Sequence, residues 1–126
     1  MLHLGDFAPP FQLTPVFGVP VTSEGRTRPI VLVFLRGLSP RRLAPLVELW
    51  PDLDREGIGL VVLTDAPLAK ARDAIPRQLL RFPIVLENPF PETPSRSGAA
   101  VVLSASRKVL YRGPISGLRP REWSSP

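Results

Sequence analysis

The sequence predicts an α/β domain in which a central mixed β-sheet is flanked by helices. Two continuous runs of β-branched and apolar residues, at 30–35 and 58–63, are typical of strands that are buried on both faces. A segment with apolar residues at helical spacing follows each run. Right-handed connections would place these two strands side by side and parallel.

The N-terminal part of the chain, residues 5–28, is rich in proline and glycine. Its short apolar pieces, Phe11–Leu13 and Val19–Val21, lie on either side of Gly18. This pattern predicts a loose N-terminal β-hairpin, after which Ile30–Leu35 forms the first core strand.

The first helix is predicted to begin with Ser39 as its N-cap and Pro40 as its first residue. The apolar residues that should face the sheet are Leu43, Leu46, Val47, Trp50 and Leu53. Because Pro45 and Pro51 fall inside this pattern, we expect a kinked helix that breaks near Pro51. Gly57 would end it.

The second strand, Ile58–Leu63, leads into a second helix that Thr64 or Asp65 would cap. The inner face of this helix is predicted to contain Leu68, Ala71 and Ile75. Pro76 would interrupt it.

The remaining elements are short. Ile84–Leu86 predicts a brief strand, and residues 88–97, with three prolines, predict a loop. Ala99–Leu103 and Lys108–Tyr111 predict a closing hairpin. The tail from Gly113 has room for about one helical turn, a reduced C-terminal helix.

Composition is that of a soluble globular chain. With 126 residues and 44% hydrophobic content, we expect a single domain over residues 1–126. No apolar run approaches the ~20 residues that a membrane span needs, and the start lacks a secretory signal, so we expect a cytoplasmic protein. The net charge of +5 comes mainly from arginine, which with 17 prolines fits a GC-rich, bacterial genome.

The chain contains no cysteine and one histidine, His3. The lack of cysteine excludes disulfides, thiolate nucleophiles and zinc sites of the cysteine type. A single histidine supports neither a multi-histidine metal site nor a Ser–His–Asp triad. We therefore expect no metal and no cofactor.

Four segments, taken in order, are similar to those of a known family. They are 5–13 (GDFAPPFQL), 30–37 (IVLVFLRG), 58–65 (IGLVVLTD) and 82–86 (FPIVL). Together with the order of the predicted elements, they resemble the thioredoxin-like superfamily, above all the peroxiredoxins of the alkyl hydroperoxide reductase and thiol-specific antioxidant group. The resemblance runs over nearly the whole chain. The resemblance implies a thioredoxin-like fold and, in active members, thiol-based peroxide reduction.

The resemblance also locates the family's catalytic site, at a Cys-Pro that starts the helix after the first core strand. Aligning that proline with Pro40 puts Ser39 at the nucleophile position and Arg42 at the position of a second cysteine. Arg36 stands where the family has a peroxide-binding Thr or Ser.

A competing alignment matches Ala44-Pro45 to the Ala-Pro of the thioredoxin helix, which puts Gly37 and Pro40 at the two cysteine positions. We prefer the first alignment because Ser39-Pro40 keeps the cap and the proline together. Neither alignment restores a thiol. An engineered cysteine-to-serine change is a further interpretation, but it leaves the arginine at the second position unexplained.

Ser39 cannot take over the role of a thiolate, because its hydroxyl proton is far harder to remove and no histidine base is at hand. As an N-cap, its hydroxyl would accept a hydrogen bond from the first helical turn. We therefore predict no catalytic residue.

Three arginines, Arg36, Arg41 and Arg42, surround the same helix start. A helix N-terminus carries partial positive charge and unpaired amides that attract anions. Together with Ser39, these residues form the candidate ligand-binding site. The alternative is that Arg41 and Arg42 simply point into solvent.

These observations favour a cysteine-less, redox-inactive peroxiredoxin-like protein that acts by binding. The candidate partners are a protein, a second copy of the chain, or a small anion at the helix start near Ser39. No basic-aromatic motif supports nucleic acid as a partner. The alternative function is an antioxidant oxidoreductase with a residual or cysteine-independent activity.

Overall fold

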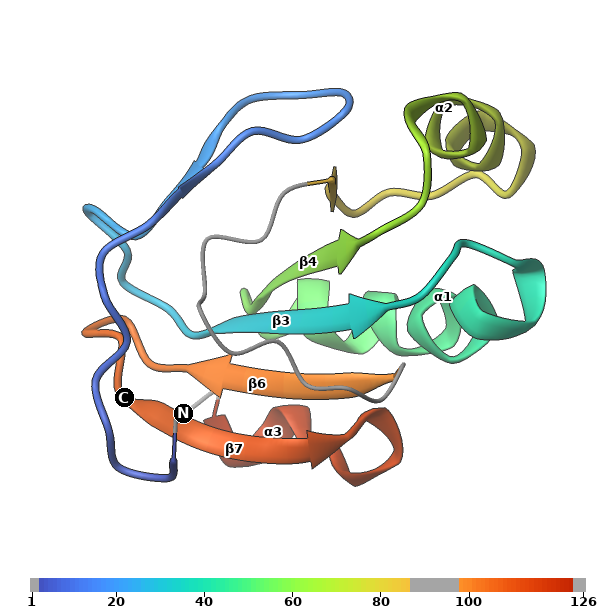
Figure 1. Ribbon diagram of the computed structural model, residues 1–126. Coiled ribbons are helices and arrows are strands. Elements are labelled where there is room, and N and C mark those ends of the chain that lie inside the picture. The colour runs from blue at the N-terminus through green and yellow to red at the C-terminus, as the bar shows by residue number, and fades with distance from the viewer. Residues whose placement is uncertain (1–2, 87–97, 124–126) are drawn as a thin grey trace.

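The computed structural model describes residues 3–86 and 98–123 (Figure 1). Its elements, in chain order, are β1 (Gln12–Leu13), β2 (Val21–Thr22), β3 (Ile30–Leu35), α1 (Pro40–Arg55), β4 (Gly59–Thr64), α2 (Leu68–Arg77), β5 (Ile84–Val85), β6 (Ala99–Leu103), β7 (Val109–Pro114), the 3-10 turn η1 (Ile115–Gly117) and α3 (Pro120–Trp123). The loop expected at 88–97 lies outside the described residues.

Five strands form the predicted mixed sheet, in the order β5-β4-β3-β6-β7. β3 runs parallel to β4, and β4 runs parallel to β5, whereas β6 is antiparallel to both β3 and β7. In the β3–β4 pair, Ile30 lies opposite Gly59 and Leu35 lies opposite Thr64. Because β3 and β4 end at the same level, α1 and α2 both start near the carboxyl ends of these strands.

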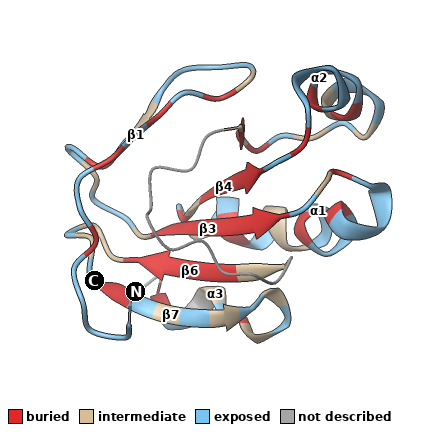
Figure 2. Ribbon diagram, viewed as in Figure 1, coloured by how far each residue is buried: buried red, intermediate tan, exposed pale blue. Residues whose placement is uncertain are grey.

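Every residue of β3 is buried, as predicted, and β4 and β6 are buried along most of their length (Figure 2). Alternate β3 side chains enter two separate core clusters. Val31 and Val33 join the cluster that contains the inner residues of α1 and α2. Leu32 joins the other cluster, with Phe11 and Leu13 from the N-terminal segment. The two long helices thus share one face of the sheet, and the N-terminal segment covers the opposite face.

Helix α1 continues to Arg55, so the predicted break near Pro51 is wrong. Pro45 and Pro51 both lie inside the helix, and both are exposed. Each leaves the carbonyl four residues earlier, on Arg41 or Val47, without its helical hydrogen bond. Those two residues are exposed, so water can hydrate the freed carbonyls while buried leucines hold the helix on the sheet.

The inner face of α1 is narrower than predicted. Leu43, Leu46 and Leu53 are buried as expected, but Val47 is 43% exposed and Trp50 is only half-buried. Gly57 follows the helix with a φ of 71°, which confirms the predicted stop.

Helix α2 begins differently from the prediction, because Pro67 is its N-cap and no side chain caps it. Thr64 Oγ1 instead accepts from the Ala66 amide at 3.2 Å, and Asp65 is engaged elsewhere. Ala71 is buried as predicted, whereas Leu68 is 44% exposed. The helix ends one residue after Pro76.

The two predicted hairpins are present. β1 pairs antiparallel with β2, and β6 pairs antiparallel with β7, which extends to Pro114 and is longer than expected. The short η1 and α3 follow, so the C-terminal helix is reduced to Pro120–Trp123. Within 3–86 and 98–123, no helix is both long enough and apolar enough to cross a membrane.

Candidate functional site

Ser39 is the N-cap of α1, as the sequence predicted. Its backbone is extended, with φ −65° and ψ 152°, and Pro40 is the first helical residue. The Ser39 Oγ accepts a hydrogen bond from the Arg42 amide at 3.3 Å. The hydroxyl is therefore committed to the helix terminus, which accounts for a serine at this position without a chemical role.

This capping limits what the helix terminus itself can offer an anion. Pro40 has no amide hydrogen, and the Arg42 amide is already bonded to Ser39. In the described part of the chain, the Arg41 amide is the first-turn N–H left without a partner. An anion here would depend mainly on nearby cationic side chains.

A groove of about 500 Å³ opens beside this terminus. Its lining comes from the start of α1, from the residues that follow β4, and from one face of α2. Of the four predicted ligand-binding residues, Ser39 and Arg42 line the groove. Arg36 and Arg41 are exposed next to it and are not part of the lining.

Two long-range hydrogen bonds hold the sides of the groove together. The Gly37 amide donates to Asp65 Oδ1 at 3.1 Å, which ties the end of β3 to the end of β4. The Gln78 side chain donates from Nε2 to the Leu38 carbonyl at 3.1 Å, which ties the end of α2 to the start of α1. Gly37 has a φ of 78°, a conformation that favours glycine.

The charges in the groove are unevenly satisfied. Asp73 pairs with Arg77 at 3.0 Å, and Asp65 accepts from the Gly37 amide. Among the residues with described side chains, nothing pairs with the side chains of Arg42 and Lys70, which line the same groove. The groove therefore presents two available cations, while both of its carboxylates are engaged.

The sequence did not identify the polar lining residues Lys70, Asp73 and Arg77 of α2, or Gln78 directly after it. Lys70, Asp73 and Arg77 are spaced three and four residues apart, which puts them on one helix face. That spacing was a usable signal for a shared face. It did not reveal that this face meets the start of α1.

The chemical groups at this helix start are a capped serine and charged side chains. No histidine lines the groove, since the one histidine, His3, belongs to the N-terminal segment, and the carboxylates of the groove are those of Asp65 and Asp73. Among the described residues, no group of three or more His, Cys, Asp or Glu could hold a metal ion. What the groove does offer is exposed positive charge next to a capped helix start.

No family sequence model matches the chain, and no curated protein matches it in sequence. Solved structures do match it in fold. The peroxidoxin BcpB from Mycobacterium tuberculosis is 16% identical, with a TM-score of 0.72 over 92% of this chain and 88% of that one. A thiol:disulfide interchange protein from Bacteroides sp. is also 16% identical, with a TM-score of 0.66 over 94% and 84%.

A third similar structure is the thiol peroxidase from Chromobacterium violaceum, which is 20% identical with a TM-score of 0.64 over 89% of this chain and 76% of that one. All three matches cover most of both chains, so the likeness concerns the whole fold. The chain therefore has the thioredoxin-like fold found in peroxiredoxins and thiol:disulfide interchange proteins, and it has this fold without a cysteine.

Proposed function

We propose that the protein is a redox-inactive, thioredoxin-like binding protein that holds an anionic group in the groove between α1 and α2. The observation that carries this proposal is the pair of available cations, Arg42 and Lys70, lining a groove whose carboxylates are both engaged. An anion placed there would also lie close to the positive end of α1.

Thiol chemistry is excluded from the proposal by composition, because the sequence has no cysteine. The serine at the expected nucleophile position is exposed and serves as a helix cap. Its hydroxyl lacks the low pKa that makes a thiolate reactive, and no histidine lines the groove to take its proton.

The favoured ligand is a carboxylate or phosphate group carried by a protein partner. The groove is open at the surface, and the chain as a whole has a net charge of +5, which would attract an acidic segment from a distance. A second copy of the chain could supply the acidic segment as well as a different protein, so self-association belongs to the same proposal.

The test is an NMR titration of the isotopically labelled protein with inorganic phosphate and with a short polyglutamate peptide. We expect saturable amide shifts at residues 37–42 and 70–78 that weaken as salt is added. The double variant Arg42→Gln/Lys70→Gln should lose them. Arg72→Gln, which removes an exposed α2 arginine outside the groove, is the matched control and should keep them. Absence of saturable shifts at the groove would rule out the proposal.

The enzymatic alternative is tested by peroxide consumption in the presence of a thiol reductant. We expect the rate to equal that of the reductant alone. Turnover that scales with protein concentration, and that survives purification to homogeneity, would establish the alternative in place of a binding role.

A further inference from the structure

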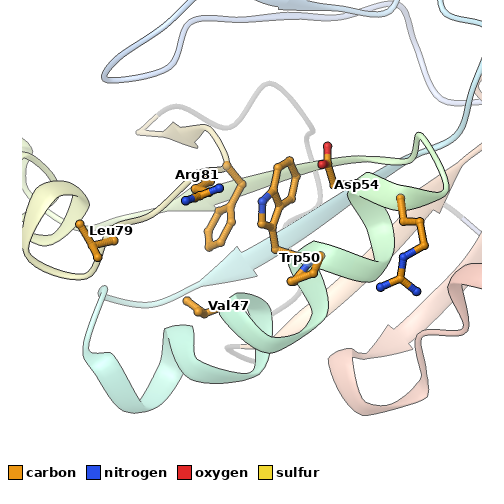
Figure 3. A pocket seen from close by; sticks show the side chains of 8 residues that line it. Val47, Trp50, Asp54, Leu79 and Arg81 are labelled. Carbon is orange, nitrogen blue, oxygen red and sulfur yellow. The ribbon is translucent and has the colours of Figure 1, made fainter.

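A second hollow, of about 380 Å³, lies between the outer side of α1 and the segment that follows α2. In the view of Figure 3, Val47, Trp50 and Asp54 rise from α1, and Leu79 and Arg81 stand on the other side. None of the residues that line this hollow lines the groove at the start of α1. The two are therefore separate sites.

The walls of the hollow are largely apolar and aromatic. The Trp50 and Phe82 rings have centroids 6.2 Å apart and planes tilted by 55°. Phe82 is buried, but Trp50 is half-buried and Val47 is 43% exposed. An apolar group that entered the hollow would contact these side chains and remove their surface from water.

Leu79, at the lip of the hollow, is an unexpected residue for its backbone position. The Leu79 amide donates to the Pro76 carbonyl at 3.3 Å, and the Leu80 amide donates to the Ile75 carbonyl at 3.0 Å. These two bonds form the Schellman motif, whose left-handed position favours Gly or Asn. Leu79 occupies that position with a φ of 54°, and its side chain is 80% exposed.

This choice of residue carries two costs in the unliganded protein. A leucine in the left-handed region is strained, and an exposed leucine leaves apolar surface in water. Backbone strain of this kind tends to occur at binding sites, where the side chain has a use. Here the use would be to cover an apolar ligand in the hollow beneath.

The polar part of the rim contains two arginines and one carboxylate. It carries Arg55, Arg81 and Asp54, and Arg55 already pairs with Asp52 at 3.4 Å. Within the described part of the chain, the Arg81 side chain has no ion pair or hydrogen-bond partner. A carboxylate is the group that a free guanidinium binds with two parallel hydrogen bonds.

We propose that this hollow binds a small apolar carboxylic acid. Its ring or branched apolar part lies against Trp50 and Phe82, its carboxylate pairs with Arg81, and Leu79 covers it from outside. The volume is at the lower end of the range for ligand pockets, about 300–1,000 Å³, which suits a ligand of one ring. This proposal is independent of the anion site at the start of α1.

The test uses N-acetyl-phenylalanine, which has one ring and one carboxylate, and its neutral amide. The indole N–H signal of Trp50 reports binding. The indole N–H signal of Trp123 is the internal reference, because Trp123 is buried and its ring centroid lies 5.8 Å from that of Tyr111. We expect the acid to shift the Trp50 signal saturably, and the amide to bind about tenfold more weakly. Equal binding of acid and amide, or no saturable shift at Trp50, would overturn the proposal.

Two variants separate the charge from the apolar cover. Arg81→Gln should weaken the acid about tenfold and leave the amide unchanged, whereas the matched Arg72→Gln should change neither. Leu79→Gly should weaken both ligands while the protein stays folded, as thermal unfolding would verify. If the acid shifts only residues 37–42 and 70–78, it binds in the groove at the start of α1, and the hollow beside Trp50 is rejected as its site. This conclusion does not depend on whether phosphate binds in that groove.

Discussion

Helices α1 and α2 follow neighbouring parallel strands and contribute to the same core cluster, yet they are held in place very differently. α1 has 16 residues and buries Leu43, Leu46 and Leu53 completely. α2 has 10 residues, and its buried positions are two alanines, Ala71 and Ala74. In Figure 2 most residues of both helices are exposed, so the difference between the helices lies in the size of the side chains that each one buries.

The helix ends differ as well. Ser39 caps α1, and Gly57 ends it in a left-handed conformation without strain. No side chain caps α2, and Leu79 ends it in the same conformation with strain. The comparison indicates that α1 anchors the fold, whereas α2 is weakly anchored and contributes its polar face and its end to two candidate binding sites.

The largest difference between the helices should appear when a leucine side chain of each is shortened. Leu46→Ala in α1 should lower the free energy of unfolding by about 2–5 kcal/mol, because it leaves a cavity under a fully buried position. Leu68→Ala in α2, at a position that is 44% exposed, should change it by no more than about 0.5 kcal/mol. Chemical denaturation measures both, and comparable losses would contradict the difference in anchoring.

A smaller effect is expected at the helix starts. Ser39→Ala should lower the free energy of unfolding by about 1 kcal/mol, since the Arg42 amide loses its side-chain acceptor and keeps only the Ser39 carbonyl. Ser39→Asn, which keeps an acceptor oxygen, should stay close to the starting protein in the same denaturation experiment. If alanine and asparagine behave alike, the cap contributes nothing to α1.

At the two helix ends we expect effects no larger than that of the cap, and of opposite sign. Gly57→Ala should lower the free energy of unfolding by about 1 kcal/mol. The added Cβ would make only ordinary van der Waals contact with the Arg28 side chain, but the φ of 71° would strain the alanine backbone. Leu79→Gly should raise the free energy of unfolding by roughly 0.5–1 kcal/mol. The variant relieves the backbone strain of the leucine, and the greater conformational entropy of glycine in the unfolded chain offsets part of that gain. Thermal unfolding of both variants decides this, and a loss of stability in Leu79→Gly would mean that the leucine supports the fold and not a ligand.

Local sequence signals predicted those elements whose causes are themselves local. The run Ile30–Leu35 matches β3 residue for residue, because a continuous apolar strand has few alternatives. The Ser39-Pro40 pair likewise gave the start of α1. The continuation of α1 past Pro51 was missed because the outcome depends on which side of the helix faces water, and this is set by packing.

The second helix shows where local reasoning reaches its limit. Thr64 or Asp65 was expected to cap α2, but the Asp65 carboxylate accepts from the Gly37 amide, 28 residues earlier in the chain. The same long-range contact helps to build the groove. For that reason Ser39 and Arg42 could be identified as candidate ligand-binding residues, but Lys70 and Gln78 could not.

The sequence by itself determined the fold class and the exclusion of thiol chemistry, because hydrophobic periodicity and the absence of cysteine need no coordinates to interpret. The tertiary structure alone decided which charges share a groove, and that Trp50, Leu79 and Arg81 surround one hollow. Side chains that meet across a fold are brought together by packing between distant segments, and local residue patterns do not encode that packing.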